Sequence, residues 1–138
     1  MLTVGIITGL QSEADCLRTI STDLNLNILV SGVSPARAEA LARQLCENRC
    51  DLLLSFGIAG ALRAGIATGD LLVPASVIQS DGRVHETNAG IRARLLQRAR
   101  AELPELAVID DAILGTDTLI GRETEKLSAG AETGAAAI

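Results

Sequence analysis

The hydrophobic positions of this chain are densest in residues 52–74, where a glycine-rich turn joins two apolar runs. The first run, LLLSF at 52–56, is apolar at nearly every position. Such runs are typical of strands covered on both faces of a parallel sheet. The second run lies at 70–74, and four glycines precede it: Gly57, Gly60, Gly65 and Gly69. The pattern predicts a central, mostly parallel sheet with helices on both faces.

Strand and helix patterns alternate along the rest of the chain. Further extended segments are expected at 2–7, 27–31, 75–79, 107–114 and 134–138, and helices at 91–103 and 122–129. The clearest helix begins at Pro35, because Ser34 is a suitable N-cap and proline a favoured first residue. Its apolar stripe consists of Ala38, Leu41, Ala42 and Leu45. Alternation of this kind indicates right-handed parallel crossovers in an α/β fold.

The first strand leads through residues 8–11 into a helix that Ser12 is expected to cap. Glu13 then lies in the first turn of that helix. Because both segments follow parallel strands, Glu13 is expected at the sheet edge from which the glycine loop emerges. The alternative is a solvated carboxylate that only interacts favourably with the helix dipole.

The glycine loop is a candidate binding segment. Glycine lets a backbone approach a ligand closely and leaves its N–H donors accessible. Ligands of open α/β sheets bind beyond the carboxyl ends of strands, where Gly57 to Gly60 would lie. Neither the dinucleotide-binding pattern G-x-G-x-x-G nor a P-loop is present, so tight turns alone are the alternative.

Three features of the second half have structural interpretations. His85 is expected in a polar loop, where a surface position competes with a catalytic one. Four arginines surround the apolar face of the helix at 91–103 and indicate a solvated surface. Gly130 is expected to end the helix at 122–129.

Composition limits the classes of partner. The chain has 138 residues, 48% of them hydrophobic, which predicts one domain over residues 1–138. Its net charge of -5 and single aromatic residue, Phe56, exclude the basic and stacking surfaces that bind nucleic acids. A small-molecule ligand is expected.

The cysteines and the N-terminal segment bear on localisation and metals. The cysteines are odd in number: Cys16, Cys46 and Cys50. With no signal-peptide pattern at the start, they predict a reduced, cytoplasmic protein. One histidine and no second ligand pair predict no metal site. No apolar run approaches the ~20 residues of a transmembrane segment.

Three blocks resemble a known family: VGIITGLQSE at 4–13, SGV at 31–33, and SFGIAGAL at 55–62 followed by GDLLV at 69–73. The family is that of nucleoside phosphorylases and nucleosidases, which includes methylthioadenosine/S-adenosylhomocysteine nucleosidases. The motifs TGL, SGVSPARAEALA, SFGIAG, GDLLVP and LGTD are most similar to those of the hopanoid-associated phosphorylase branch. The resemblance covers essentially the whole chain.

The resemblance implies cleavage of the N-glycosidic bond of an adenine nucleoside, with release of adenine. In the hopanoid-associated branch the substrate is adenosylhopane, a lipid-linked nucleoside of hopanoid biosynthesis. The alternatives are a methylthioadenosine/S-adenosylhomocysteine nucleosidase-like hydrolase and a non-catalytic nucleoside- or adenine-binding fragment. No cofactor is implied, and water and inorganic phosphate both stay open as the nucleophile. The family also implies a homo-oligomer.

The same resemblance assigns site residues. Glu13 aligns with the carboxylate that activates water in the nucleosidases, which implies a general base. The remaining expected substrate contacts are Thr8 and Gly9 in the nucleophile pocket, Ala59 and Gly60 in the loop beneath the purine, Leu119 and Ile120 over the base, and Gly57.

The chain also departs from the family pattern. Ser55 and Ile58 stand where bacterial purine phosphorylases hold phosphate with arginine and serine. Family members continue beyond the strand at 135–138 with a Met-Glu motif that binds ribose and an aspartate that protonates the purine. These departures predict an incomplete nucleoside phosphorylase-like domain with impaired activity.

Overall fold

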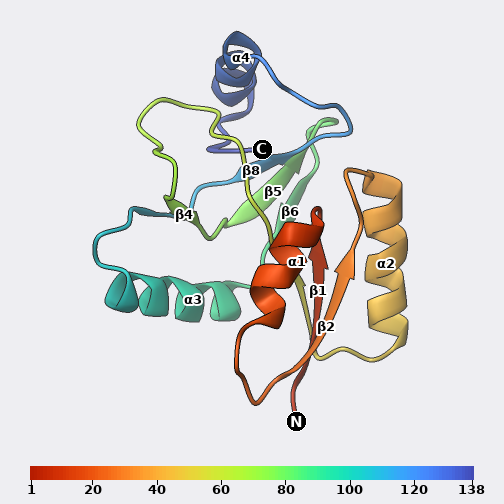
Figure 1. The fold of residues 1–138 in the computed structure, drawn as a ribbon. Helices are drawn as coiled ribbons and strands as arrows, with labels where there is room; N and C mark the ends of the chain where they lie inside the picture. Colours follow the sequence, from red (N-terminus) through yellow and green to blue (C-terminus); the bar gives the residue numbers. More distant parts are fainter. The chain divides into compact units, whose positions relative to one another are not determined.

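The computed structural model describes residues 1–138, which form two compact units, Met1–Ile58 and Ala59–Ile138. The first unit is a β-α-β-α-β arrangement (Figure 1). Its elements are β1 (Thr3–Thr8), α1 (Gln11–Arg18), β2 (Asn25–Val30), α2 (Pro35–Glu47) and β3 (Leu52–Ser55). The three strands are parallel in the order β2-β1-β3, so β1 is central. The α/β fold predicted from the hydrophobic pattern is confirmed.

The two faces of this sheet are covered by different helices. Val4 and Ile6 of β1 form a buried cluster with Leu17 of α1. Gly5 lies between them in sequence and points to the opposite face, because side chains alternate along a strand. A Cβ at Gly5 would lie 3.1 Å from the side chain of Leu45 in α2. The small residue at position 5 therefore allows α2 to pack closely on the central strand.

The two helix starts of the first unit differ from each other. At α2, Ser34 accepts a hydrogen bond from the Arg37 N–H and Pro35 is the first helical residue, so this N-cap prediction is confirmed. At α1, the expected cap at Ser12 is wrong. The N-cap is Leu10, whose side chain cannot accept a hydrogen bond, and the carboxylate of Glu13 accepts the Leu10 N–H instead.

The second unit contains two small sheets and two helices. Its elements are β4 (Leu71–Leu72), β5 (Ser76–Gln79), β6 (Val84–Glu86), α3 (Ala89–Glu102), β7 (Val108–Ile109), β8 (Ile113–Gly115) and α4 (Glu123–Thr133). Strands β4 and β7 pair in parallel. In the sheet β6-β5-β8, β5 is antiparallel to β6 and parallel to β8.

Residues 136–138 pair with two other segments of the second unit. The segment 136–138 is hydrogen-bonded on one side to Gly60 and Leu62 and on the other to Ala112 and Leu114. Leu62, Leu114 and Ala135 form the core of this unit. An extended segment at 134–138 was predicted. Its strand-like part begins only after Gly134, which ends α4 in a left-handed conformation.

Three expectations for the second half are corrected. His85 lies in strand β6 and pairs with Val77, although its side chain is exposed as expected. Gly130 lies inside α4 and does not end it. The segment at 107–114 forms two strands, β7 and β8, that belong to different sheets. None of the helices combines the length and apolar character needed to cross a bilayer.

Candidate active-site carboxylate

Glu13 is the buried acidic residue of the first unit, with 9% of its surface exposed. Its carboxylate accepts three backbone hydrogen bonds. Oε2 accepts the N–H groups of Gly9 at 2.9 Å and Leu10 at 2.8 Å. Oε1 accepts the N–H of Ile58, 45 residues away in sequence, at 2.9 Å. These contacts fix both the position and the orientation of the carboxylate.

The sheet order explains why these groups meet. Strands β1 and β3 are neighbours, and their register places Ile7 beside Ser55. The pairing continues one step further, because the Phe56 N–H donates to the Ile7 carbonyl at 3.0 Å. The chain after β1 turns into α1, and the chain after β3 enters the glycine loop. Glu13 and Ile58 therefore meet at the carboxyl edge of the sheet, where ligands of open α/β folds bind.

The arrangement leaves the carboxylate with a free acceptor position. An ionised carboxylate offers about four lone-pair sites, two on each oxygen. Both sites on Oε2 are occupied by N–H donors, whereas Oε1 accepts only the Ile58 N–H. The remaining site on Oε1 can accept a hydrogen bond from water or a hydroxyl group. A general base needs such an acceptor position within hydrogen-bond reach of the proton that it removes.

Thr8 stabilises the turn between β1 and α1. Its side chain is buried, with 1% exposed, and its hydroxyl donates to the Leu10 carbonyl at 3.2 Å. The predicted contact between Thr8 and a nucleophile stays a prediction. Sequence reasoning missed Ser31, whose hydroxyl lies 3.2 Å from the Thr8 carbonyl and 2.8 Å from that of Gly32. Ser31 directly follows β2, and this position after a parallel strand is the signal from which it could have been predicted.

Gly57 lies directly against the carboxylate. A Cβ at this position would lie 2.7 Å from Oε1 of Glu13. The first unit therefore brings together three of the predicted residues, Gly9, Glu13 and Gly57. The other predicted contacts, apart from Thr8, belong to the second unit.

In the second unit, the predicted base-binding residues have mixed environments. The N–H of Gly60 donates to the Ile138 carbonyl at 2.8 Å, so it is not the accessible donor expected from the glycine pattern. Ile120 packs against the core of the unit, and Leu119 is 95% exposed. Ala59 is exposed.

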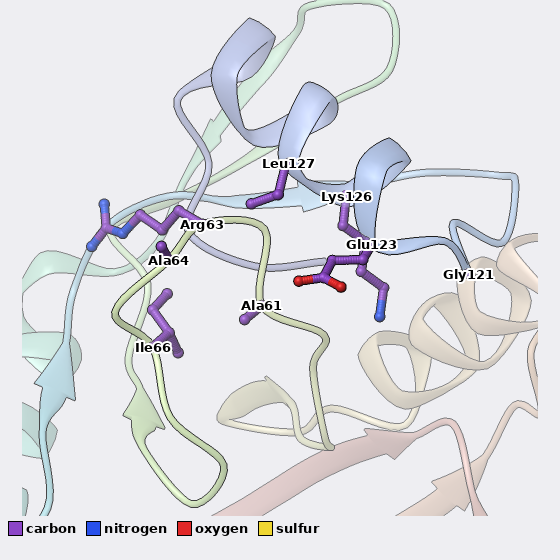
Figure 2. A pocket seen from close by; sticks show the side chains of 8 residues that line it. All are labelled: Ala61, Arg63, Ala64, Ile66, Gly121, Glu123, Lys126 and Leu127. Atoms are coloured by element: carbon purple, nitrogen blue, oxygen red, sulfur yellow. The ribbon is translucent and has the colours of Figure 1, made fainter.

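A pocket of about 430 Å³ opens in the second unit beside these segments (Figure 2). Its apolar lining comes from Ala61, Ala64, Ile66 and Leu127, and its polar lining from Arg63, Glu123 and Lys126, with Gly121 completing it. Ala61 directly follows Gly60, and Gly121 directly follows Ile120. The pocket thus borders both predicted base-binding segments, although none of the predicted residues lines it. Clusters of three or more metal-ligating side chains are absent from the chain.

The fold matches solved nucleosidase structures along nearly its whole length. A mutant of Helicobacter pylori 5′-methylthioadenosine/S-adenosylhomocysteine nucleosidase, solved with 5′-methylthioadenosine in its active site, matches with a TM-score of 0.85 and 16% identity, covering 99% of this chain and 74% of that one. A Streptococcus pyogenes S-adenosylhomocysteine nucleosidase in complex with 5-methylthiotubericidin matches with a TM-score of 0.87 and 17% identity, covering 99% of this chain and 72% of that one. A Helicobacter pylori futalosine hydrolase mutant matches with a TM-score of 0.82 and 15% identity, covering 99% of this chain and 78% of that one.

Sequence comparison supplies the family. No curated protein matches the sequence significantly. Residues 6–116 match the phosphorylase superfamily, and this range includes Glu13, the glycine loop and most of both units. The chain therefore belongs to the phosphorylase superfamily.

Proposed function

We propose that this protein hydrolyses the N-glycosidic bond of an adenine nucleoside of the methylthioadenosine/S-adenosylhomocysteine type, with Glu13 as general base. The observation that carries the proposal is the carboxylate of Glu13, held at the carboxyl edge of the sheet with one acceptor site unused. In the proposed step Glu13 takes a proton from water, and the water oxygen bonds to C1′. The C1′–N9 bond breaks, and its electron pair leaves with adenine, which takes up a proton from solvent while Glu13 returns its proton to solvent.

The comparisons favour this substrate class over adenosylhopane. The structural matches described above include two nucleosidases of this type and a futalosine hydrolase. Adenosylhopane stays a prediction that rests only on the sequence resemblance. Contacts from Ala59, Gly60, Leu119 and Ile120 to the base are likewise proposed, as are a homo-oligomeric assembly and a cytoplasmic location.

The surroundings of Glu13 favour water over phosphate as the nucleophile. Ser55 and Ile58 supply no cation, and the Ile58 N–H is already donated to Glu13. An incoming phosphate would meet the negative carboxylate without the paired donors that normally hold it. Water carries no such charge and can donate to Oε1. We therefore propose a hydrolytic reaction.

The test is adenine release by the purified 138-residue chain from methylthioadenosine and S-adenosylhomocysteine, with and without phosphate, followed by chromatography. Release that is independent of phosphate and is lost in Glu13→Gln supports the proposal. The matched control is Asp15→Asn, because Asp15 lies on the same helix but is exposed. Calorimetric binding of the nucleoside without adenine release would overturn the proposal and favour a non-catalytic binder. Retained activity in Glu13→Gln would overturn the role of Glu13.

A further inference from the structure

We infer that Gly57 is a positioning residue for Glu13, rather than a turn glycine or a substrate contact. The inference deepens the proposed function, on which its kinetic part rests. Three atoms of the Glu13 carboxyl group occupy the volume that a side chain at position 57 would fill. A Cβ there would lie 2.7 Å from Oε1, 3.0 Å from Cδ and 3.0 Å from Oε2. Contacts this short require one of the two groups to move.

The backbone conformation of Gly57 does not itself require glycine. Positive φ angles occur at Gly65 and Gly69 in the same loop, where an added Cβ would meet open space. Gly57 shows the opposite combination, with φ outside the left-handed region and no free volume on the side of Glu13. Side chains are disfavoured at Gly65 and Gly69 by conformation. At Gly57 the three atoms nearest to an added Cβ all belong to the Glu13 carboxyl group.

The consequence of a side chain at position 57 is specific to one oxygen of the carboxylate. Oε1 is the atom nearest to the added Cβ, and it is also the atom that accepts the Ile58 N–H. Oε2 is held separately by Gly9 and Leu10. A methyl group at position 57 therefore pushes Oε1 away from Ile58 while the contacts of Oε2 can persist. Because Oε1 carries the free acceptor site, this displacement moves the proposed base.

The first arm of the test is kinetic. Gly57→Ala should lower kcat for adenine release about 100-fold, as expected for a displacement of about 1 Å at a reacting group. KM should change little, because Gly57 is not a substrate contact. The control is Gly90→Ala at the start of α3, where the added Cβ lies 3.5 Å from Asn88 Oδ1, an ordinary contact. A change in KM alone would overturn the inference in favour of substrate binding.

The second arm needs no turnover, so it separates this inference from the proposed function. In the wild type, the amide protons of Gly9, Leu10 and Ile58 should all be protected in ¹⁵N-¹H hydrogen-exchange spectra, because each N–H is donated to the Glu13 carboxylate. In Gly57→Ala the Ile58 amide should lose this protection, whereas the other two should keep it. An Ile58 amide that is protected as in the wild type would overturn the inference. Absence of adenine release by the wild type would overturn only the proposed function.

A double-variant comparison covers the case in which Gly57→Ala folds poorly. If the carboxylate alone excludes a side chain, Gly57→Ala should lower the melting temperature in the wild-type background. It should leave the melting temperature unchanged in the Glu13→Ala background, where the carboxylate is gone. Equal losses in the two backgrounds would show that other atoms exclude the side chain, and would overturn the inference.

Discussion

Gly130 of α4 packs directly on the backbone of Leu62. A Cβ at Gly130 would overlap the Leu62 carbonyl oxygen and would lie 3.0 Å from its carbonyl carbon. Leu62 is 1% exposed, and its N–H donates to the Ala136 carbonyl, so this backbone is tied on its other side to the end of the chain. The helix can approach the core of the second unit this closely only because position 130 has no side chain.

Gly130→Ala is expected to destabilise the protein although alanine is the better helix former. The gain in helix propensity is about 1 kcal/mol. Relief of the clash requires a shift of α4 against a hydrogen-bonded backbone, and overpacking of this kind costs about 1–3 kcal/mol or more. A net loss should therefore appear in urea unfolding. Gly121→Ala is the control, because its Cβ would meet open space. Equal stability of the two variants would contradict the close approach of α4.

Ser34 and Ser12 provide a paired test of helix capping. Ser34→Ala removes the acceptor of the Arg37 N–H and should cost about 0.5–2 kcal/mol in the free energy of unfolding. Ser12→Ala should stay within about 0.5 kcal/mol, because Ser12 is an exposed residue inside α1 and not its cap. Denaturant titrations of both variants measure the difference. A larger loss for Ser12→Ala would contradict the helix start at Gln11.

These two serines also show what the sequence could predict. Ser34 was predictable because Ser-Pro before an amphipathic stripe is a local signal. The start of α1 was not, because its N-cap is a leucine and the capping acceptor is Glu13 at the third helical position. The α/β fold was predictable because each strand and each helix has a pattern of apolar residues within a short stretch of sequence. The division of residues 107–114 between two sheets depends on distant partners and left no local signal.

The candidate site was predictable to a similar extent. The position of Glu13 near the glycine loop followed from the order of strands and helices. Its hydrogen bond to Ile58, across 45 residues, required knowledge of the strand register. The glycine pattern suggested accessible N–H donors, yet the N–H of Gly60 is donated to Ile138 at the far end of the chain. Glycine content alone does not distinguish a ligand cradle from close backbone packing.

The turn between β5 and β6 should show a pH-dependent contact. The pKa of Asp81 is lowered below its ordinary value, first by the backbone N–H of Arg83 and then by the Arg83 side chain. Because the folded-state pKa is depressed, the stabilisation is present above the unfolded pKa of about 3.9 and is lost as pH falls through the folded value. Arg83→Ala keeps the backbone donor, so it should raise the Asp81 pKa only part of the way. An NMR titration of the Asp81 side chain measures this, and complete recovery of the ordinary pKa would show that the side chain dominates.

Thr8→Val separates a supporting role of Thr8 from direct contact with the nucleophile. Valine keeps the branched shape and removes the hydroxyl that donates to the Leu10 carbonyl. Loss of this hydrogen bond should cost about 1 kcal/mol in the free energy of unfolding. If the hydroxyl only supports the loop, adenine release at saturating substrate should fall by less than about ten-fold, which corresponds to 1.4 kcal/mol of barrier. Urea unfolding and steady-state kinetics on the same preparation measure both effects. A loss of kcat far beyond ten-fold with unchanged stability would instead place the Thr8 hydroxyl at the nucleophile, as the sequence resemblance predicts.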